Sequence, residues 1–182
     1  GYASESACVW AAIDNSDGTL IIYRELYAKN LLGTELADLL TNMEYEDPWS
    51  ISGVLDTACW NRTGMTGPTV GETLIRAGHK LRRADKNRVQ GKIQIHEYLK
   101  IQPSGRPRIQ IFNTCPNLIR ELQSIPLDKN NPEDVDTHAD DHAYDALRYL
   151  IMSRPRIVDP FQRMRDIQKE QLFQPFDNTF GY

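Results

Sequence analysis

The chain has 182 residues, of which 40% are hydrophobic and 25% charged, and its formal net charge is −4. This length and composition predict one globular domain with a sizeable core, and they exclude a collagen-like repeat or a wholly disordered chain. Three widely spaced cysteines do not suggest a disulfide framework, no apolar run reaches the roughly 18 residues of a membrane span, and no signal peptide is visible.

The first half of the sequence predicts a strand pair, a helix and a short buried strand. Apolar runs over 7–13 and 19–27 flank turn residues at 14–18, a pattern typical of an antiparallel hairpin. Leucines and a methionine at helical spacing over 36–43 predict a helix with Thr34 as its N-cap. The apolar run 51–55 predicts a central strand that ends at Asp56.

The second half alternates predicted helices and strands. Thr69 and Glu72 form a capping-box pattern and Gly78 stands where a helix would end, which predicts a helix over 70–77. A helix over 89–100 is expected to bury three apolar residues, namely Val89, Ile93 and Leu99. The other expected elements are strands over 79–83 and 108–112, a helix from Pro116 and a last helix from Thr137 to Met152. This alternation favours a mixed α/β sheet covered by helices.

Charge is unevenly distributed along the chain. Residues 76–108 contain ten lysines and arginines against two acids, whereas residues 121–145 contain eight acids and one lysine. A basic stretch can hold a nucleic-acid backbone through many phosphate contacts. An acidic cluster can bind divalent cations. Two solvated faces of opposite charge are the alternative interpretation of the same pattern.

The strongest local signal is the segment D-D-H-A-Y-D-A-L-R-Y at 140–149. On a helix, Asp141 and Asp145 lie one turn apart on one face, and His142 lies beside them. Carboxylates this close repel each other, and a hard divalent cation bound by their oxygens would relieve the repulsion. The alternative is a solvated helix start, where acids favour the helix dipole and Arg148 pairs with Asp145.

Asp56 is the second candidate. A carboxylate at the end of an apolar strand lies at the edge of a sheet, where open α/β sheets place their sites. The alternative is a turn residue that caps the following loop, 57–67. The sequence has neither of the glycine-rich nucleotide-binding motifs, and His138 and His142 lack the glutamate that a zinc hydrolase needs between them.

Four segments together resemble the C-terminal nuclease domain of tailed-phage large terminases: V-L-D-T-A at 54–58, R-A-D-K-N-R-V-Q-G-K-I at 83–93, R-I-Q-I-F at 108–112, and the 140–149 segment. The resemblance implies a ribonuclease-H-like α/β fold, in which helices flank a mixed central sheet. It also implies an endonuclease that depends on divalent metal ions and cuts concatemeric double-stranded viral DNA with little sequence specificity during packaging.

The resemblance also implies roles for residues. Two Mg²⁺ or Mn²⁺ ions would be bound by Asp56, Asp141 and Asp145, with His142 as a further catalytic residue, and a first-strand aspartate would fall just before Gly1. The basic residues expected to contact DNA phosphates are Arg82, Arg83, Lys86, Arg88 and Lys92. We expect a nuclease domain at 1–155 and a C-terminal tail at 156–182.

Further expectations concern the cellular setting. In the full-length protein the partners would be viral DNA, the terminase small subunit and the portal, in the cytoplasm of an infected bacterium and without a membrane. Two alternatives remain open at this point. One is another ribonuclease-H-like nuclease, such as a junction resolvase or a transposase core. The other is a non-catalytic module that docks DNA or a partner protein.

Overall fold

The computed structural model describes residues 5–62, 67–128, 134–136 and 140–154. Its strands are β1 (Ser6–Ile13), β2 (Leu20–Ala28), β3 (Ser52–Leu55), β4 (Lys80–Arg83) and β5 (Ile109–Ile111). Its helices are α1 (Gly33–Glu44), the 3₁₀ helix η1 (Thr57–Trp60), α2 (Val70–Arg76), α3 (Arg88–Leu99), α4 (Pro116–Ser124) and α5 (His142–Ser153). Within these ranges no helix has the length and apolar character needed to cross a membrane.

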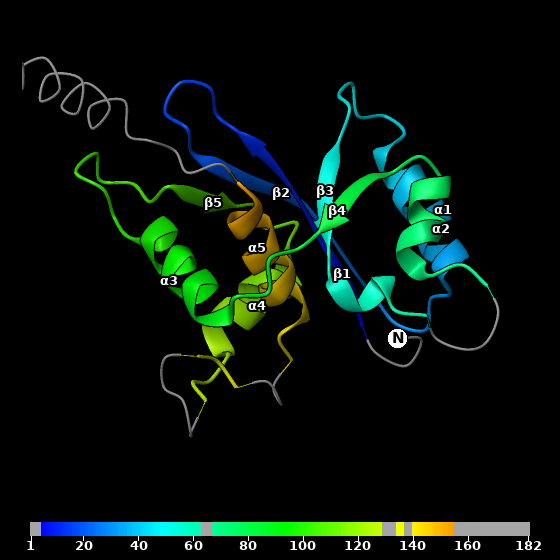
Figure 1. Ribbon diagram of the computed structural model, residues 1–182. Helices are drawn as coiled ribbons and strands as arrows, with labels where there is room; N and C mark the ends of the chain where they lie inside the picture. Colours follow the sequence, from blue (N-terminus) through cyan, green and yellow to red (C-terminus); the bar gives the residue numbers. More distant parts are fainter. Residues whose placement is uncertain (1–4, 63–66, 129–133, 137–139, 155–182) are drawn as a thin grey trace, which may run out of the picture.

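The strands form a three-stranded and a two-stranded sheet. β1 pairs with β2 antiparallel, and β2 pairs with β5 parallel, in the order β1-β2-β5. β3 and β4 pair parallel beside them (Figure 1). The predicted hairpin and the predicted mixed α/β architecture, with antiparallel and parallel strand pairs and helices beside them, are confirmed.

Helices cover the three-stranded sheet on both sides. Ile95 of α3, Leu118 of α4 and Leu147 of α5 belong to one buried cluster, which β2 and β5 complete. Leu40 of α1 and Leu74 of α2 belong to a second cluster, which β1 and β2 complete. The strands therefore lie between an α3–α4–α5 layer and an α1–α2 layer (Figure 1).

A bulge in the hairpin sets which side chains enter each core. Trp10 pairs with Arg24 but the next residue, Ala11, pairs with Ile22, so Tyr23 is the extra residue. Because side chains alternate along a strand, one extra residue reverses the alternation. Ile22 accordingly packs in the α3–α4–α5 core, whereas residues 23, 26 and 28 pack with α1 and α2.

Two predicted helix starts differ from the observed ones. α1 begins at Gly33 instead of after Thr34, because the Glu35 carboxylate reaches back and accepts a 2.7 Å hydrogen bond from the Leu32 amide. α5 begins at His142, with Asp141 as its N-cap. Thr137, the predicted start of that helix, lies outside the described residues. The predicted capping box of α2 is present as expected.

The predicted inward face of α3 is wrong. Val89, Ile93 and Leu99 are 36%, 46% and 43% exposed, whereas Gly91 and Ile95 are buried. The reason is a close helix contact: a Cβ added at Gly91 would lie 2.4 Å from Cγ of Arg148 in α5. The aliphatic stem of Arg148 therefore takes the place that an apolar side chain of α3 would fill.

We expect Gly91→Ala to lower the free energy of unfolding by roughly 1–3 kcal/mol, because overpacking a buried contact forces side chains from their rotamers. Urea denaturation measures this change. Gly33→Ala is the control, since its Cβ would meet Val70 at an ordinary 3.7 Å. Equal stability of both variants would contradict the close α3–α5 contact.

Candidate active site

Asp56 and Asp145 meet at one tyrosine hydroxyl, although they are far apart in the sequence. Asp56 follows β3, and Asp145 lies in the first turn of α5. The Tyr149 hydroxyl donates a 2.8 Å hydrogen bond to Oδ2 of Asp56 and lies 3.4 Å from Oδ2 of Asp145. The end of β3 and the start of α5 therefore bring two of the candidate carboxylates together.

Asp56 also caps a turn, as its alternative interpretation expected. Its Oδ1 accepts a 2.8 Å hydrogen bond from the Ala58 amide at the start of η1, and Nζ of Lys86 lies 3.2 Å from the same oxygen. Partial burial acts to raise the pKa of Asp56, but the bonds from Ala58, Tyr149 and Lys86 outweigh it. The pKa therefore lies below its ordinary value, so Asp56 is a carboxylate at neutral pH.

Asp145 is held by a buried arginine. Nε and Nη2 of Arg148 lie 3.0 Å and 2.9 Å from Oδ1 of Asp145, and Arg148 is only 1% exposed. Nη1 of Arg148 is buried without a hydrogen-bond partner in the described part of the chain. This contact fixes Oδ1 of Asp145 inside the protein and leaves Oδ2 on the side of Tyr149.

A second arginine, Arg88, lies among three acids. Its Nε donates to Oδ2 of Asp134 at 2.8 Å, while Nη2 and Nη1 lie 3.6 Å and 3.7 Å from Oδ2 of Asp141 and Asp145. Burial and the negative charge of Asp145 raise the pKa of Asp141 above its usual value, and Arg88 opposes that rise. A guanidinium thus stands where the sequence predicted that carboxylates would surround a cation.

A buried glutamate holds the N-terminus of α5. Glu121 of α4 is 1% exposed, and its Oε2 accepts hydrogen bonds of 2.8 Å and 2.9 Å from the Ala143 and Tyr144 amides. Asp141, the N-cap residue, makes no side-chain capping bond. Glu121 therefore supplies the negative charge that a helix start favours and positions the segment that carries Asp145.

His142 makes different contacts from the two aspartates. Its Nε2 lies 3.1 Å from Oε2 of Glu5, and its ring packs against Tyr27 with 6.4 Å between ring centroids. Glu5 also pairs with Lys29. The structure therefore places His142 in a pair with Glu5, whereas Asp56 and Asp145 share Tyr149.

The predicted DNA contacts lie on the segment that joins β4 to α3 and on these two elements (Figure 1). Arg82 donates to the Ser153 carbonyl at 2.7 Å, and the guanidinium of Arg83 lies 5.1 Å from the Trp60 ring centroid. Lys86 and Arg88 contact the candidate carboxylates, and Lys92 is in the second turn of α3. A basic segment therefore borders the acidic site.

The donor set suits a hard divalent cation, because carboxylate oxygens are the ligands that Mg²⁺ and Mn²⁺ prefer. The arrangement does not yet enclose one. Among the residues that the structure describes, no three His, Cys, Asp or Glu side chains converge as a metal-binding group. The acids are instead held by ion pairs to Lys86, Arg88 and Arg148.

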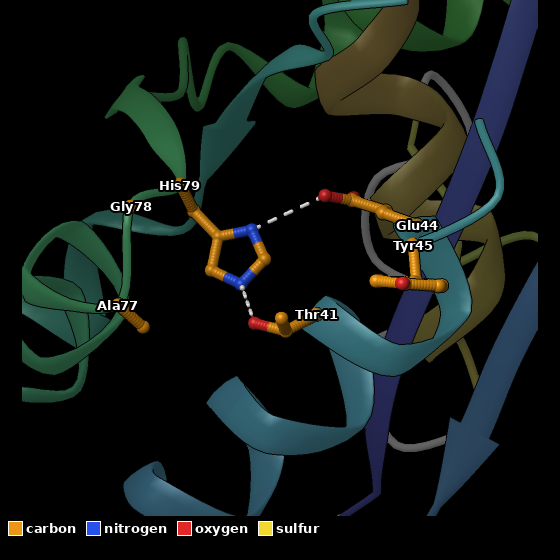
Figure 2. Close-up of a pocket in the computed structure, with 6 residues that line it drawn as sticks. All are labelled: Thr41, Glu44, Tyr45, Ala77, Gly78 and His79. Carbon is orange, nitrogen blue, oxygen red and sulfur yellow. Dashed lines mark hydrogen bonds and ion pairs between the residues drawn. The ribbon is translucent and has the colours of Figure 1, made fainter. Parts of the chain in front are cut away.

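A separate polar cluster lies in a depression of about 240 Å³ between α1 and the turn from α2 to β4 (Figure 2). Nδ1 of His79 is 3.3 Å from Glu44, and Nε2 is 3.2 Å from the Thr41 hydroxyl. The order Glu44–His79–Thr41 is that of an acid–histidine–hydroxyl triad in a hydrolase. Such a triad also needs free N–H donors to bind an oxyanion, but Thr41 lies within α1, where backbone amides donate to carbonyls of the helix. His79 therefore serves to fasten α1 to β4.

Solved structures that match this fold include large terminases of bacteriophages. The nuclease domain of SPP1 g2p with bound Mn matches with a TM-score of 0.56 and 20% identity, over 82% of this chain and 78% of its own. The P22 large terminase nuclease domain matches with a TM-score of 0.62 and 17% identity, over 92% and 82%. The chain has the fold of a large terminase nuclease domain.

A third match places this fold within a longer protein. The large terminase of a thermophilic bacteriophage, in complex with ADP, matches with a TM-score of 0.61 and 15% identity, over 84% of this chain. The chain spans 40% of that thermophilic phage protein. No protein-family profile matches the sequence, and no curated protein matches it. The fold that the sequence motifs led us to expect is thus confirmed at the level of structure.

We expect Lys86→Ala to raise the pKa of Asp56, because a positive charge and a hydrogen bond to its carboxylate are lost. A carboxyl-detected NMR titration measures this pKa. A carboxyl group whose pKa is lower in the folded state stabilises the fold at pH values above its pKa in the unfolded chain. This contribution is lost as the pH falls through the folded-state pKa. The stability difference between wild type and Lys86→Ala should therefore be largest near neutral pH and should vanish in acid.

Lys80→Ala is the matched control for this titration. Lys80 also lies in the basic segment, but its Nζ donates to the Ser50 hydroxyl at 2.7 Å. The pKa of Asp56 should stay at its wild-type value in this variant. Equal shifts in both variants would mean that a general loss of positive charge, and not the Lys86 contact, controls Asp56.

Proposed function

We propose that this chain is the endonuclease domain of a viral genome-packaging terminase. It would cut concatemeric double-stranded DNA with the help of divalent metal ions. The observation that carries the proposal is the meeting of Asp56 and Asp145 at Tyr149, within a fold shared with terminase nuclease domains. The bound Mn of the SPP1 domain supports a divalent cation.

Asp56, Asp141 and Asp145 would hold two Mg²⁺ or Mn²⁺ ions, and His142 would serve as a further catalytic residue. When bound, such ions activate a water molecule and stabilise the leaving oxygen of a phosphodiester. Tyr149 would orient Asp56 through its hydrogen bond, and Arg148 would hold Asp145 from the protein side. We propose Tyr149 and Arg148 as positioning residues, a role that the sequence motifs did not assign to them.

DNA would bind along the basic segment beside the acids. The side chains proposed to contact phosphates are Arg82, Arg83, Lys86, Arg88 and Lys92. Contacts to phosphates carry no sequence information, so cutting should depend little on base sequence. In the full-length protein, the nuclease domain at 1–155 would work with the small subunit and the portal in the cytoplasm of an infected bacterium.

Two other functions are compatible with parts of the site. A junction resolvase or transposase core would use a similar set of carboxylates, and a strong preference for branched over linear DNA would favour it. A non-catalytic docking module is favoured by the ion pairs that already neutralise Asp56 and Asp145. Cleavage that requires these two aspartates would exclude the docking module.

We expect Asp56→Asn and Asp145→Asn each to abolish plasmid cleavage in Mn²⁺, because an amide is a far weaker ligand for a hard cation than a carboxylate. A gel assay of plasmid nicking measures this activity, and circular dichroism checks the fold. The control is Asp38→Asn, which changes an exposed acid of α1.

Cleavage at the wild-type rate in both site variants would contradict the metal assignment. Because the resemblance places a further aspartate just before Gly1, the assay should include a protein that begins upstream of that residue. Wild-type activity that appears only in the longer protein would support a role for this additional carboxylate.

We expect Lys92→Ala to weaken duplex DNA binding and to reduce the slope of log affinity against log salt by about one unit, the effect of losing one phosphate contact. Fluorescence anisotropy at several salt concentrations measures the slope. Arg76→Ala is the control, because it removes the same charge from the last turn of α2. An unchanged slope in Lys92→Ala would remove this residue from the DNA interface.

A further inference from the structure

We propose that Arg88 competes with divalent cations for the carboxylates of the candidate site, so that this one side chain couples cation binding to DNA binding. The inference rests on the proposed nuclease function and concerns the regulation of the same site. It starts from a conflict: the sequence predicts Arg88 as a phosphate contact, whereas the structure places it among acids.

The guanidinium of Arg88 uses a different nitrogen for each acid. Nε donates to Oδ2 of Asp134, whereas Nη2 and Nη1 form longer ion pairs, of 3.6 Å and 3.7 Å, with Oδ2 of Asp141 and of Asp145. Nη2 also donates to the Val135 carbonyl at 3.4 Å. The Asp141 and Asp145 oxygens are ones that a cation at this site would need. Since a guanidinium in this position would repel a divalent cation, Arg88 and the cation exclude each other from the Asp141 and Asp145 carboxylates.

The two arginines at Asp145 are therefore not equivalent. Arg148 contacts Oδ1, is almost fully buried and is wedged against Gly91, so it has no room to leave. Arg88 contacts Oδ2 over a longer distance of 3.7 Å, and its side chain is about a quarter exposed. By rotating toward solvent, Arg88 would give up its hydrogen bonds to Asp134 and to the Val135 carbonyl, while Arg148 would continue to hold Asp145.

A DNA phosphate is a suitable alternative partner for Arg88. Arg88 begins α3, directly after the segment that carries Arg82, Arg83 and Lys86. A guanidinium fork matches the two free oxygens of a phosphodiester as well as it matches a carboxylate. DNA bound along this segment would draw Arg88 away and free Oδ2 of Asp141 and Asp145. By linkage, cations that occupy these oxygens would in turn strengthen DNA binding.

The first test measures Mn²⁺ affinity by calorimetry in the absence of DNA. Arg88→Gln should bind Mn²⁺ at least about fivefold more tightly than wild type, the lower end of typical coupling factors. Arg83→Gln is the matched control, because it removes the same charge from the same segment but packs on Trp60. Equal affinity in the two variants, weaker binding by Arg88→Gln, or no measurable binding by any protein would overturn the proposal.

Arg88→Gln could fold less stably, because Asp134, Asp141 and Asp145 lose their shared partner. Thermal unfolding provides a second test that does not require the variant to be as stable as wild type. Ligands that bind only the folded state raise Tm. Mn²⁺ should therefore raise the Tm of Arg88→Gln by more than it raises that of wild type. An equal or smaller increase would contradict the proposed competition.

A DNA-binding test separates this inference from the proposed function. With Ca²⁺, a second oxygen-seeking cation, Arg88→Gln should reduce the salt slope of duplex binding by about one unit, and without divalent ions it should leave the slope unchanged. The same slope change in both conditions would overturn the coupling. Failure of the proposed function has another signature, namely full cleavage by Asp56→Asn and Asp145→Asn.

Discussion

The site depends on one buried ion pair, between Arg148 and Asp145. A guanidinium this deep in a protein is stable only if its charge is paired, since the loss of hydration is large. Asp145 supplies that pairing, the Tyr149 ring lies 4.5 Å from the guanidinium, and Gly91 makes room for the aliphatic stem. The orientation of a candidate ligand is thus set by the packing of α3 on α5. Changes in that packing should alter the site even where no ligand is touched.

Around this pair, positively charged side chains neutralise the carboxylates, which would otherwise repel each other. Lys86 neutralises Asp56, Arg88 is shared among several carboxylates, and Tyr149 links the two halves through its hydroxyl. Such balance explains how so acidic a segment can pack against a sheet. It also explains why the donor chemistry suits a divalent cation while the described side chains do not enclose one.

Local patterns predicted the parts of the fold that local interactions determine. The capping box at Thr69 is an example, because neighbouring residues are sufficient to form it. The strand that ends at Asp56 was visible in its own apolar run, although it forms by pairing with β4. The prediction of the inward face of α3 was wrong, because that face is determined by the contact between Gly91 and Arg148, which is distant in the sequence. Glu121 was missed for the same reason, since its partners are amides of another helix. The meeting of Asp56 with the last helix followed from the motif resemblance, and no local periodicity could have supplied it.

The extra residue in β2 has a consequence for how this hairpin can change over evolution. Tyr23 interrupts the alternation of side chains along the strand. Even-numbered residues therefore face the α3–α4–α5 layer before Tyr23 and the α1–α2 layer after it. Deleting this single residue would restore an unbroken ladder and would keep Leu26 opposite Cys8 and Tyr27 opposite Ala7, each facing the layer that it faces now. Loss of one residue elsewhere in the strand, with the bulge kept, would instead reverse the facing of the residues beyond it, so a gap between distant relatives within this strand should fall at Tyr23.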